Sequence, residues 1–369
     1  MTTRQHGAMS EALAMVAPGT PFRDGLDRIL RAKRGGLVVV GDGPEVLSIC
    51  SGGFLLDSEF SPQRLSELAK MDGAIILAPD ASRIARANVH LMPDPSITTT
   101  ETGTRHRTAE RVARSIDVPV LSVSAAMSVI AVYRNDVKHT IQPTGWLHDR
   151  TDQALATMQR FRSRFDVALG NLSILELEDT VSVGDVVGVI QAAEMVLRIA
   201  EEVDGYLVEL GEDGRLVGLQ SAELVDGVAP TLHLVVRDYC VMPEAQHNGS
   251  AGIVDSAGIV DSVVERLAHL PSDELRDPAR VAAILRLPGP FHDAESGVEP
   301  RGYRLLHHLP RFSDTIIERI VDRFVNLQQI MRASMAELEQ VEGVGQARAH
   351  SVKDGLARLA EASIFERYQ

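Results

Sequence analysis

The feature that most constrains the fold is a change in the pattern of apolar residues near residue 149. Before it, short β-branched runs bounded by Gly, Pro or Asp alternate with segments whose apolar residues recur at a helical period. The predicted strands are GLVVVG (36–41), GAIILA (73–78), VPVLSVS (118–124) and SVIAVYR (128–134), and the helices between them include PQRLSELAKM (62–71) and TAERVARSI (108–116). This alternation predicts an α/β domain around a largely buried sheet.

After Asp149 the apolar positions keep a helical period and strand signals disappear, which predicts a helical region. One exception is YLVELGEDGRLVGLQ (206–220), which resembles a hairpin turning at Asp213-Gly214. The hexapeptide SAGIVD occurs twice in tandem at 250–261. We expect this repeat to lie in a loop, because loops accept insertions at little cost.

Length and composition narrow the class of protein. A chain of 369 residues exceeds what one core usually organises, so two or three domains are expected. Two distant cysteines, Cys50 and Cys240, argue against a disulfide framework or a zinc site and favour a reducing cytosol. No apolar run approaches the roughly 20 residues of a membrane span, so we expect a soluble, unexported protein. The net charge of -14 restricts any nucleic-acid binding to a local patch.

The stretch GDGPEV, residues 41–46, begins like a dinucleotide-binding fingerprint after a strand. It fails at the third position, where Val46 replaces the glycine that close packing needs. Pro44 also stands at the expected helix start. A corner between a strand and a turn is therefore the favoured interpretation.

The basic stretch ETGTRHRTAER, residues 101–111, is unusual in an acidic chain. Gly103 permits a close backbone approach, and Thr104 supplies a hydroxyl directly before Arg105-His106-Arg107. Free amides at a helix start, together with guanidinium groups and a threonine, form a phosphate-binding arrangement. The alternative is that these arginines flank a helix in solvent, as charge runs usually do.

Asp72, in KMDGAIIL, directly precedes a strongly apolar strand. At the strand edge it is placed either to hold a divalent cation or to cap a turn. With the basic stretch, it predicts an anion site for which a nucleoside triphosphate is the candidate ligand. The residues alone do not define a reaction.

A third motif, VEGVG at 341–345, places two glycines around an apolar residue between predicted helices. Such a turn exposes backbone amides that can bind a phosphate, although a plain helical hairpin looks similar. Residues 301–369 hold ten basic and nine acidic side chains, so this segment is far less acidic than the rest. DNA contact here would use backbone and shape, with little base readout.

Asp72-Gly73-Ala74 and the later residues 103–108 together resemble the paired DGA and RHR motifs of the diadenylate cyclase family. Over essentially the whole chain, the order of elements resembles the members that carry a C-terminal helix-hairpin-helix domain. The resemblance implies an α/β cyclase domain with a central mixed sheet at 1–147, a helical spine or linker at 148–300 and an all-α helix-hairpin-helix DNA-binding domain at 301–369.

The same resemblance implies a nucleotidyltransferase that condenses two ATP into cyclic di-AMP and two pyrophosphates, with Mg²⁺ or Mn²⁺ as cofactor. It further implies a cytoplasmic homo-octamer, whose cyclase domains meet face to face and whose activity is coupled to branched or damaged DNA. The competing hypothesis is a DNA-binding repair or scaffold protein with a catalytically silent, regulatory nucleotide site. The intact motif pair favours the cyclase.

Site residues follow from the motif positions. The resemblance implies catalytic roles for Asp72, Arg105, His106 and Arg107; ATP binding by Gly73, Leu91, Thr104, Arg105, His106, Arg107 and Thr108; DNA binding by Gly343, Val344 and Gly345; and Asp72 as the metal ligand. Asp72 either binds the metal or helps activate the ribose 3′-hydroxyl. For His106, contact with phosphate, ligation of metal and a role in holding the loop all stay open.

Overall fold

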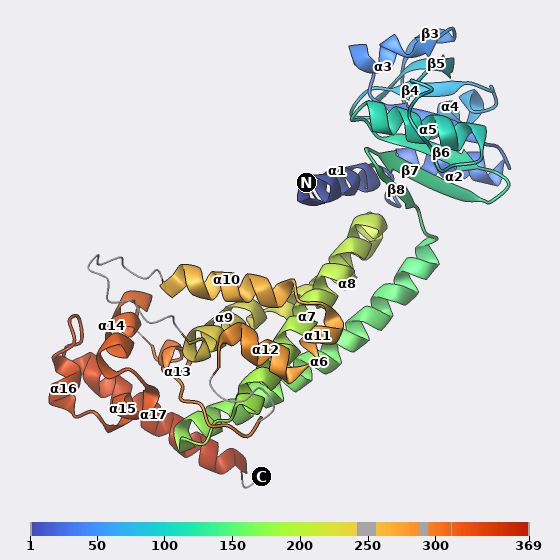
Figure 1. Ribbon diagram of the computed structural model, residues 1–369. Helices are drawn as coiled ribbons and strands as arrows, with labels where there is room; N and C mark the ends of the chain where they lie inside the picture. Colours follow the sequence, from blue (N-terminus) through green and yellow to red (C-terminus); the bar gives the residue numbers. More distant parts are fainter. Residues whose placement is uncertain (1, 242–255, 288–293, 311, 368–369) are drawn as a thin grey trace. The chain divides into compact units, whose positions relative to one another are not determined.

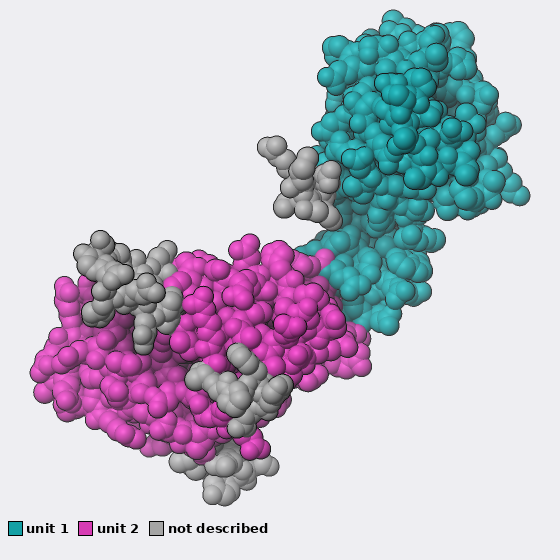
Figure 2. All heavy atoms as spheres, in the orientation of Figure 1, with its two compact units in different colours: residues 1–154, 202–220 teal, residues 155–201, 221–369 magenta. Residues whose placement is uncertain are grey.

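The computed structural model of the protein describes residues 2–241, 256–287, 294–310 and 312–367. They form two compact units, coloured separately in Figure 2. Unit 1 comprises residues 1–154 and 202–220, and unit 2 comprises residues 155–201 and 221–369. Two long helices, α6 (Thr144–Glu178) and α7 (Val183–Leu210), contribute residues to both units. The three-domain division at residues 147 and 300 stays a prediction.

In its described residues, unit 1 contains an eight-stranded mixed sheet of strand order β2-β5-β4-β1-β6-β7-β8, with β3 also paired to β5. The pair β1 and β4 is parallel, and the other pairs are antiparallel. The strands are β1 (Gly36–Val40), β2 (Cys50–Ser51), β3 (Phe54–Glu59), β4 (Ala74–Leu77), β5 (Arg83–Leu91), β6 (Val120–Ser124), β7 (Val129–Arg134) and β8 (Val137–Thr140). The mixed sheet and four predicted strands are confirmed.

The sheet is covered on both faces (Figure 1). Along β1, Val38 and Val40 join the core shared with α1 (Thr2–Met15), α2 (Pro21–Arg31) and α4 (Pro62–Leu68). Leu37 and Val39 join the opposite core, shared with α3 (Pro44–Ser48) and α5 (Thr104–Ser115). A strand buried on both faces has a continuous apolar sequence, which is why GLVVVG could be predicted as a strand.

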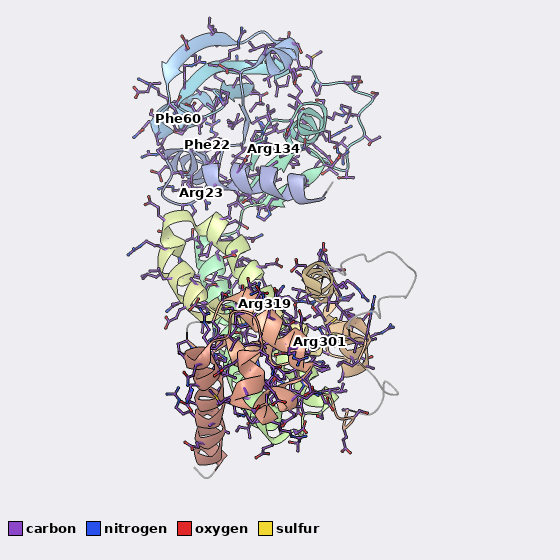
Figure 3. The ribbon with its side chains drawn as sticks, turned by 90° about the vertical axis from the view of Figure 1, so that its left-hand side faces the viewer. Phe22, Arg23, Phe60, Arg134, Arg301 and Arg319 are labelled. Atoms are coloured by element: carbon purple, nitrogen blue, oxygen red, sulfur yellow. The ribbon has the colours of Figure 1, made fainter. Side chains whose placement is uncertain are left out.

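Aromatic packing joins α2 to the segment before α4. The rings of Phe22 and Phe60 meet edge to face with centroids 5.9 Å apart (Figure 3). At the GDGPEV corner, Gly41 takes a φ of +137° and its amide bonds the Leu77 carbonyl, while Pro44 opens the five-residue α3. The corner interpretation is confirmed.

The expected hairpin at 206–220 is wrong. Helix α7 runs to Leu210, a 3₁₀ turn covers Gly211–Gly214, and α8 (Arg215–Val225) follows. A Cβ built on Gly214 would lie 2.8 Å from Leu207, so glycine here lets the chain turn back closely. The Asp-Gly pair serves a corner between helices, and tertiary packing overrides its hairpin preference.

The loop expectation for the SAGIVD repeat is wrong for its second copy. That copy, residues 256–261, opens α10 (Ser256–Ala268), where Val260, Val263 and Leu267 are buried at a helical spacing. The first copy lies outside the described residues. A duplicated hexapeptide is thus compatible with helix where its apolar residues meet a core.

The described residues of unit 2 are mainly helical, with one isolated antiparallel bridge between Ser182 and Gly297. Its further helices are α9 (Val228–Tyr239), α11 (Ser272–Leu275), α12 (Pro278–Leu285), α13 (Tyr303–His307), α14 (Asp314–Phe324), α15 (Leu327–Arg332), α16 (Met335–Glu339) and α17 (Gln346–Arg367). The last five share one hydrophobic core, centred on residues such as Ile317, Leu338 and Val352. The predicted helical spine and all-α C-terminal region are confirmed.

A buried ionic cluster joins three helices of unit 2. The Arg304 guanidinium, 1% exposed, lies 2.5 Å from Glu176 on α6. On α9, Asp238 accepts the backbone amides of residues 302–304 at 2.6–2.9 Å, which caps the start of α13. Burial raises the pKa of Asp238, and burial raises that of Glu176 to about 7 against the opposing pull of Arg304. Two buried carboxylates thus depend on one cation.

Candidate functional site

The basic stretch forms the first turn of α5, which packs on the sheet through Ala109, Val112 and Ala113. Gly103 is the N-cap residue, with an extended backbone and no side-chain cap. Within the described residues, the first backbone bond of the turn runs from the Arg107 amide to the Gly103 carbonyl, at 2.9 Å. The preceding amides point out of the helix start, where an anion is favoured.

Asp72 and Arg105, predicted from separate motifs, lie in direct contact. The Arg105 Nη2 atom donates to Asp72 Oδ1 at 2.6 Å. Asp72 lies two residues before β4, and its side chain is 94% exposed, so its other oxygen remains open to solvent. The sheet therefore brings an aspartate to the start of α5. An exposed pair of this kind is weak and readily remodelled by a ligand.

Gly35, just before β1, was missed by sequence reasoning. A Cβ built on it would lie 2.8 Å from Arg105 Nη1, so the absence of a side chain leaves room for that guanidinium. The RGG run at 34–36 was the signal that sequence reasoning did not use.

The remaining residues of the first turn differ in exposure. Thr104 and Arg107 are exposed, while Thr108 is half-buried and its hydroxyl donates to the Thr104 carbonyl at 3.0 Å. Arg105 and Arg107 therefore place two cationic groups at the helix start, and the Thr108 hydroxyl retains acceptor capacity.

His106 points into the protein. Its side chain belongs to a residue only 8% exposed, its Nδ1 lies 2.9 Å from the Tyr133 hydroxyl, and its Nε2 lies 3.4 Å from Ser122 Oγ. Burial lowers the pKa of His106, with Glu101 opposing and Lys138 reinforcing that effect. Because both ring nitrogens have protein partners, this geometry favours the loop-holding role among the three left open.

Three residues that the sequence analysis did not select, Glu101, Tyr133 and Lys138, extend the hydrogen bonding of His106. The Tyr133 hydroxyl donates to Glu101 Oε1 at 3.1 Å, and Lys138 Nζ donates to the same oxygen at 2.5 Å. Glu101 was visible at the start of the quoted stretch, but no spacing rule connects it to Tyr133 on β7. Only the sheet register brings these side chains together.

The loop before α5 is tied to the helix by Glu110, Arg111 and Arg114. Glu110 accepts the Thr99 hydroxyl and the Thr100 amide, while Arg111 and Arg114 donate to loop carbonyls at 2.9 and 2.5 Å. Burial works against the Glu110 charge, but the Thr99 hydrogen bond and Arg114 outweigh it and lower the pKa of Glu110. The start of α5 is thereby held from its loop side as well.

Strand β5 determines the surroundings of Gly73 and the position of Leu91. A Cβ built on Gly73 would lie 2.3 Å from the Asn88 carbonyl carbon, so the backbones of the DGA motif and β5 meet too closely for any side chain. Leu91, at the end of β5, is half-buried and packs against the same core as α5. Gly73 lies between Asp72 and β4, and Leu91 ends β5, the strand paired with β4.

Metal binding has one candidate protein ligand at this site. In the part of the chain that the structure describes, no group of three or more His, Cys, Asp or Glu side chains gathers as a metal cage. A single exposed carboxylate fits Mg²⁺, because this ion commonly takes one or two protein carboxylates and completes its shell with substrate phosphates and water.

The C-terminal motif forms the turn between α16 and α17. Gly343 takes a φ of +90°, whereas Gly345 has an ordinary φ and open space around its α-carbon. Arg319 and Arg348 donate to the carbonyls of Glu342 and Gly343 at 3.2 and 2.7 Å. Of the two glycines, only Gly343 therefore has a backbone conformation that disfavours a side chain.

Val344 is buried in the C-terminal core, at 3% exposure. Its side chain anchors the turn, and its amide donates to the Val341 carbonyl at 2.9 Å, so the amides beside it at Gly343 and Gly345 are the candidates for a ligand. Among the described helices, none is long and apolar enough to cross a membrane.

Comparison with known proteins covers nearly the whole chain. Residues 23–138 match the family model described as DisA bacterial checkpoint controller nucleotide-binding, and residues 141–292 match the DisA bacterial checkpoint controller linker region. The DNA integrity scanning protein DisA of Kineococcus radiotolerans is 49% identical over 98% of this chain and 97% of its own. Those of Streptomyces coelicolor and Acidothermus cellulolyticus are 48% and 50% identical over 98% and 96% of this chain, and 94% of each of theirs.

Proposed function

The chain belongs to the DisA family of diadenylate cyclases, and from this premise we propose that it condenses two ATP into cyclic di-AMP under the control of DNA. The observation that carries the proposal is the contact between Asp72 and Arg105 at the open start of α5. An aspartate beside the phosphate site supplies the metal ligand or the base that the transfer needs.

The proposed reaction has two equivalent halves. In each, the 3′-hydroxyl oxygen of one ATP attacks the α-phosphorus of the other, a ribose–phosphate bond forms, and pyrophosphate leaves with the electrons of the broken P–O bond. The hydroxyl proton passes to a base or to solvent. The protein must therefore align two nucleotides and stabilise phosphate charge.

The first turn of α5 supplies groups for this task. Arg105, Arg107 and the free amides bind phosphate oxygens, Thr104 and Thr108 line the same site, and Gly73 and Leu91 bound the nucleoside. Asp72 holds the metal or accepts the 3′-hydroxyl proton. His106 acts from behind the turn, because its ring faces the sheet.

We propose Mg²⁺ or Mn²⁺ as the cofactor, held by Asp72 together with substrate phosphates. Such an ion neutralises phosphate charge when it is bound. Its preferred identity follows from activity measured with each metal in turn.

Catalysis requires assembly, since one site holds one ATP and the product contains two nucleotides. We propose that cyclase domains of two chains face each other within a homo-octamer. Unit 1 carries exposed apolar side chains, Phe54 and Leu55 on β3, Met92 and Met127, that are available for self-association. A cytoplasmic location is proposed with it, where ATP and DNA are both present.

For DNA, we propose that the turn at 341–345 binds a phosphate through backbone amides. The positive φ of Gly343 and the open surroundings of Gly345 leave the peptide edge accessible, and Arg319 and Arg348 add positive charge beside it. An assembly of several chains would bind branched DNA at several arms at once, which multiplies a weak single contact.

The direct test incubates the protein with ATP and Mg²⁺ or Mn²⁺ and searches for cyclic di-AMP by mass spectrometry. The proposal expects product together with pyrophosphate, and a change in turnover when branched DNA is added. ATP binding without product would support the scaffold alternative instead.

Replacing Arg105 and Arg107 together by alanine is expected to weaken ATP binding as well as turnover, since two charge-assisted contacts to phosphate are lost. Calorimetric titration with ATP measures the effect, which we place at roughly tenfold or more in Kd, the equivalent of about 1.4 kcal/mol. The double variant Arg28→Ala, Arg64→Ala removes the same charge from α2 and α4 and serves as the control. Equal affinity in both variants would mean that the cluster only flanks a helix.

Replacing Gly343 and Gly345 together by valine is expected to reduce binding to a four-way DNA junction while leaving DNA-independent cyclase activity largely intact. Valine at Gly343 cannot adopt the positive φ without strain, and both side chains obstruct the peptide edge. Gel-shift titrations at two salt concentrations measure the affinity, and binding of the wild type should fall as salt rises. If the variant binds the junction as tightly as the wild type, the turn is only a structural corner.

A further inference from the structure

We infer that Tyr133 is a positioning residue for the nucleotide site, which orients the first turn of α5 by holding His106 from behind with the help of Glu101. The inference rests on the proposed function of that turn and names residues outside the paired motifs. It concerns a single chain of hydrogen bonds within unit 1.

Five side chains from five segments form this chain. Lys138 on β8 and Tyr133 on β7 both donate to Glu101 in the loop before α5, at 2.5 and 3.1 Å. The Tyr133 oxygen then meets His106 Nδ1 at 2.9 Å, and His106 Nε2 meets Ser122 on β6 at 3.4 Å. The sheet, the loop and the helix start are thus connected through one imidazole.

The direction of each bond follows from the chemistry of its ends. Glu101 accepts only, so Tyr133 donates its proton there and its oxygen is left to accept from His106 Nδ1. The imidazole therefore carries its proton on Nδ1, and Nε2 accepts from the Ser122 hydroxyl. Burial lowers the pKa of His106 and, with Glu101, raises that of Tyr133, so both are neutral near pH 7.

The network can orient Arg105 and Arg107 because His106 lies between them in the sequence. It lies between Arg105 and Arg107, and successive helical side chains are about 100° apart around the axis. With the ring of His106 fixed against the sheet, the two arginines emerge on either side of it toward the open helix start. Glu101 fixes the entering loop in the same way, two residues before Gly103.

The hydroxyl, rather than the ring, carries this function. Tyr133 is 1% exposed among Leu37, Val39 and other core residues, where a phenylalanine ring would pack as well. Its oxygen contacts His106 and Glu101, both of which belong to the segment that enters and begins α5. Without the oxygen, His106 Nδ1 would be buried without its acceptor, and the ring would turn to find another.

The test is Tyr133→Phe, which retains the core ring and removes the oxygen. The expected result is a fall of roughly 10- to 100-fold in kcat/KM for cyclic di-AMP synthesis, with weaker ATP binding by calorimetry and little change in Tm. Tyr206→Phe is the matched control, since its hydroxyl bonds Glu202 in the same unit away from this network, and it should behave as wild type.

A second pair of variants tests the tautomer. In His106→Asn the side-chain amide nitrogen lies near the Nδ1 position and retains a donor for Tyr133, whereas in His106→Gln the nitrogen lies nearer Nε2. We expect the asparagine variant to retain more activity, and the glutamine variant, which has already lost the donor to Tyr133, to lose less on addition of Tyr133→Phe than the wild type does. Better retention by glutamine would instead indicate that Nε2 serves phosphate or metal, and would overturn the inference.

Two further outcomes would also overturn it. One is Tyr133→Phe with wild-type kcat, KM and ATP affinity; the other is an activity loss that only follows a smaller folded fraction, with KM and ATP affinity unchanged. If the wild type makes no cyclic di-AMP, the proposed reaction fails, and ATP affinity in the same variants still decides whether Tyr133 positions the site.

Discussion

Asp72→Asn is expected to lower cyclic di-AMP synthesis by roughly 10²-fold or more while the protein remains folded and assembled. An amide is a poorer metal ligand than a carboxylate and is not a base, so either role proposed for Asp72 is lost. The side chain is 94% exposed, and its contact with Arg105 lies at the surface, so little stability depends on it.

The measurement is the initial rate of product formation at saturating ATP and metal, with circular dichroism and light scattering to verify fold and assembly. Asp117→Asn is the matched control, because Asp117 also forms an exposed ion pair with an arginine, Arg134, at 3.0 Å. Near-normal turnover by Asp72→Asn would remove this residue from the mechanism. Comparable losses in both variants would trace the effect to surface charge.

Arg304→Met is expected to destabilise unit 2 by about 3–5 kcal/mol, the usual cost of leaving a buried charge without its partner. The methionine fills much of the space but leaves Glu176 and Asp238 facing each other in the interior without a cation. These carboxylates hold together α6, α9 and the start of α13, so the contact between the C-terminal helices and α6 should loosen first.

Urea unfolding followed by helical circular dichroism measures the loss. The control is Arg319→Met, because the Arg319–Glu342 pair is exposed at 41% and 84%, and its removal should cost no more than about 1 kcal/mol. Figure 3 labels Arg319. Equal destabilisation in the two variants would mean that the Arg304 cluster is not sealed from water.

The pH dependence of Arg304→Met has a defined sign. The pKa of Glu176 lies at about 7 in the folded chain and near 4.5 in the unfolded chain, so the folded state binds its proton more tightly. The stability that this group contributes is complete below about pH 4.5 and is lost as pH rises through 7. Without Arg304 the folded pKa rises further, so the variant should lose more stability at pH 8 than at pH 5.

Several strands and helices could be predicted from the sequence because the patterns that identify them involve only neighbouring residues. The run at 36–41 is buried on both faces and therefore continuous in apolar residues, and the run at 118–124 is mostly apolar, with Ser122 buried among its valines and leucine. The helical spacing of Ala109, Val112 and Ala113 identified the buried face of α5. Residue chemistry likewise singled out Asp72 and the basic stretch as an anion site.

Other elements depend on partners far along the chain. Strand β5 escaped prediction because its register against β4 shifts twice and Asn88 takes a φ of +56°, which breaks the alternation of buried and exposed residues. The Asp-Gly pair at 213–214 signalled a hairpin, but packing against Leu207 made it a corner between helices.

The sequence by itself determined the α/β start, the helical continuation and the residue types of a phosphate site. The tertiary structure alone decided which of those residues meet: that Asp72 touches Arg105 across 33 positions, and that His106 turns inward to Tyr133. The physical reason is that helix and strand periods are set by neighbouring residues, whereas a hydrogen bond between segments is set by sheet register and by the side chains buried around it.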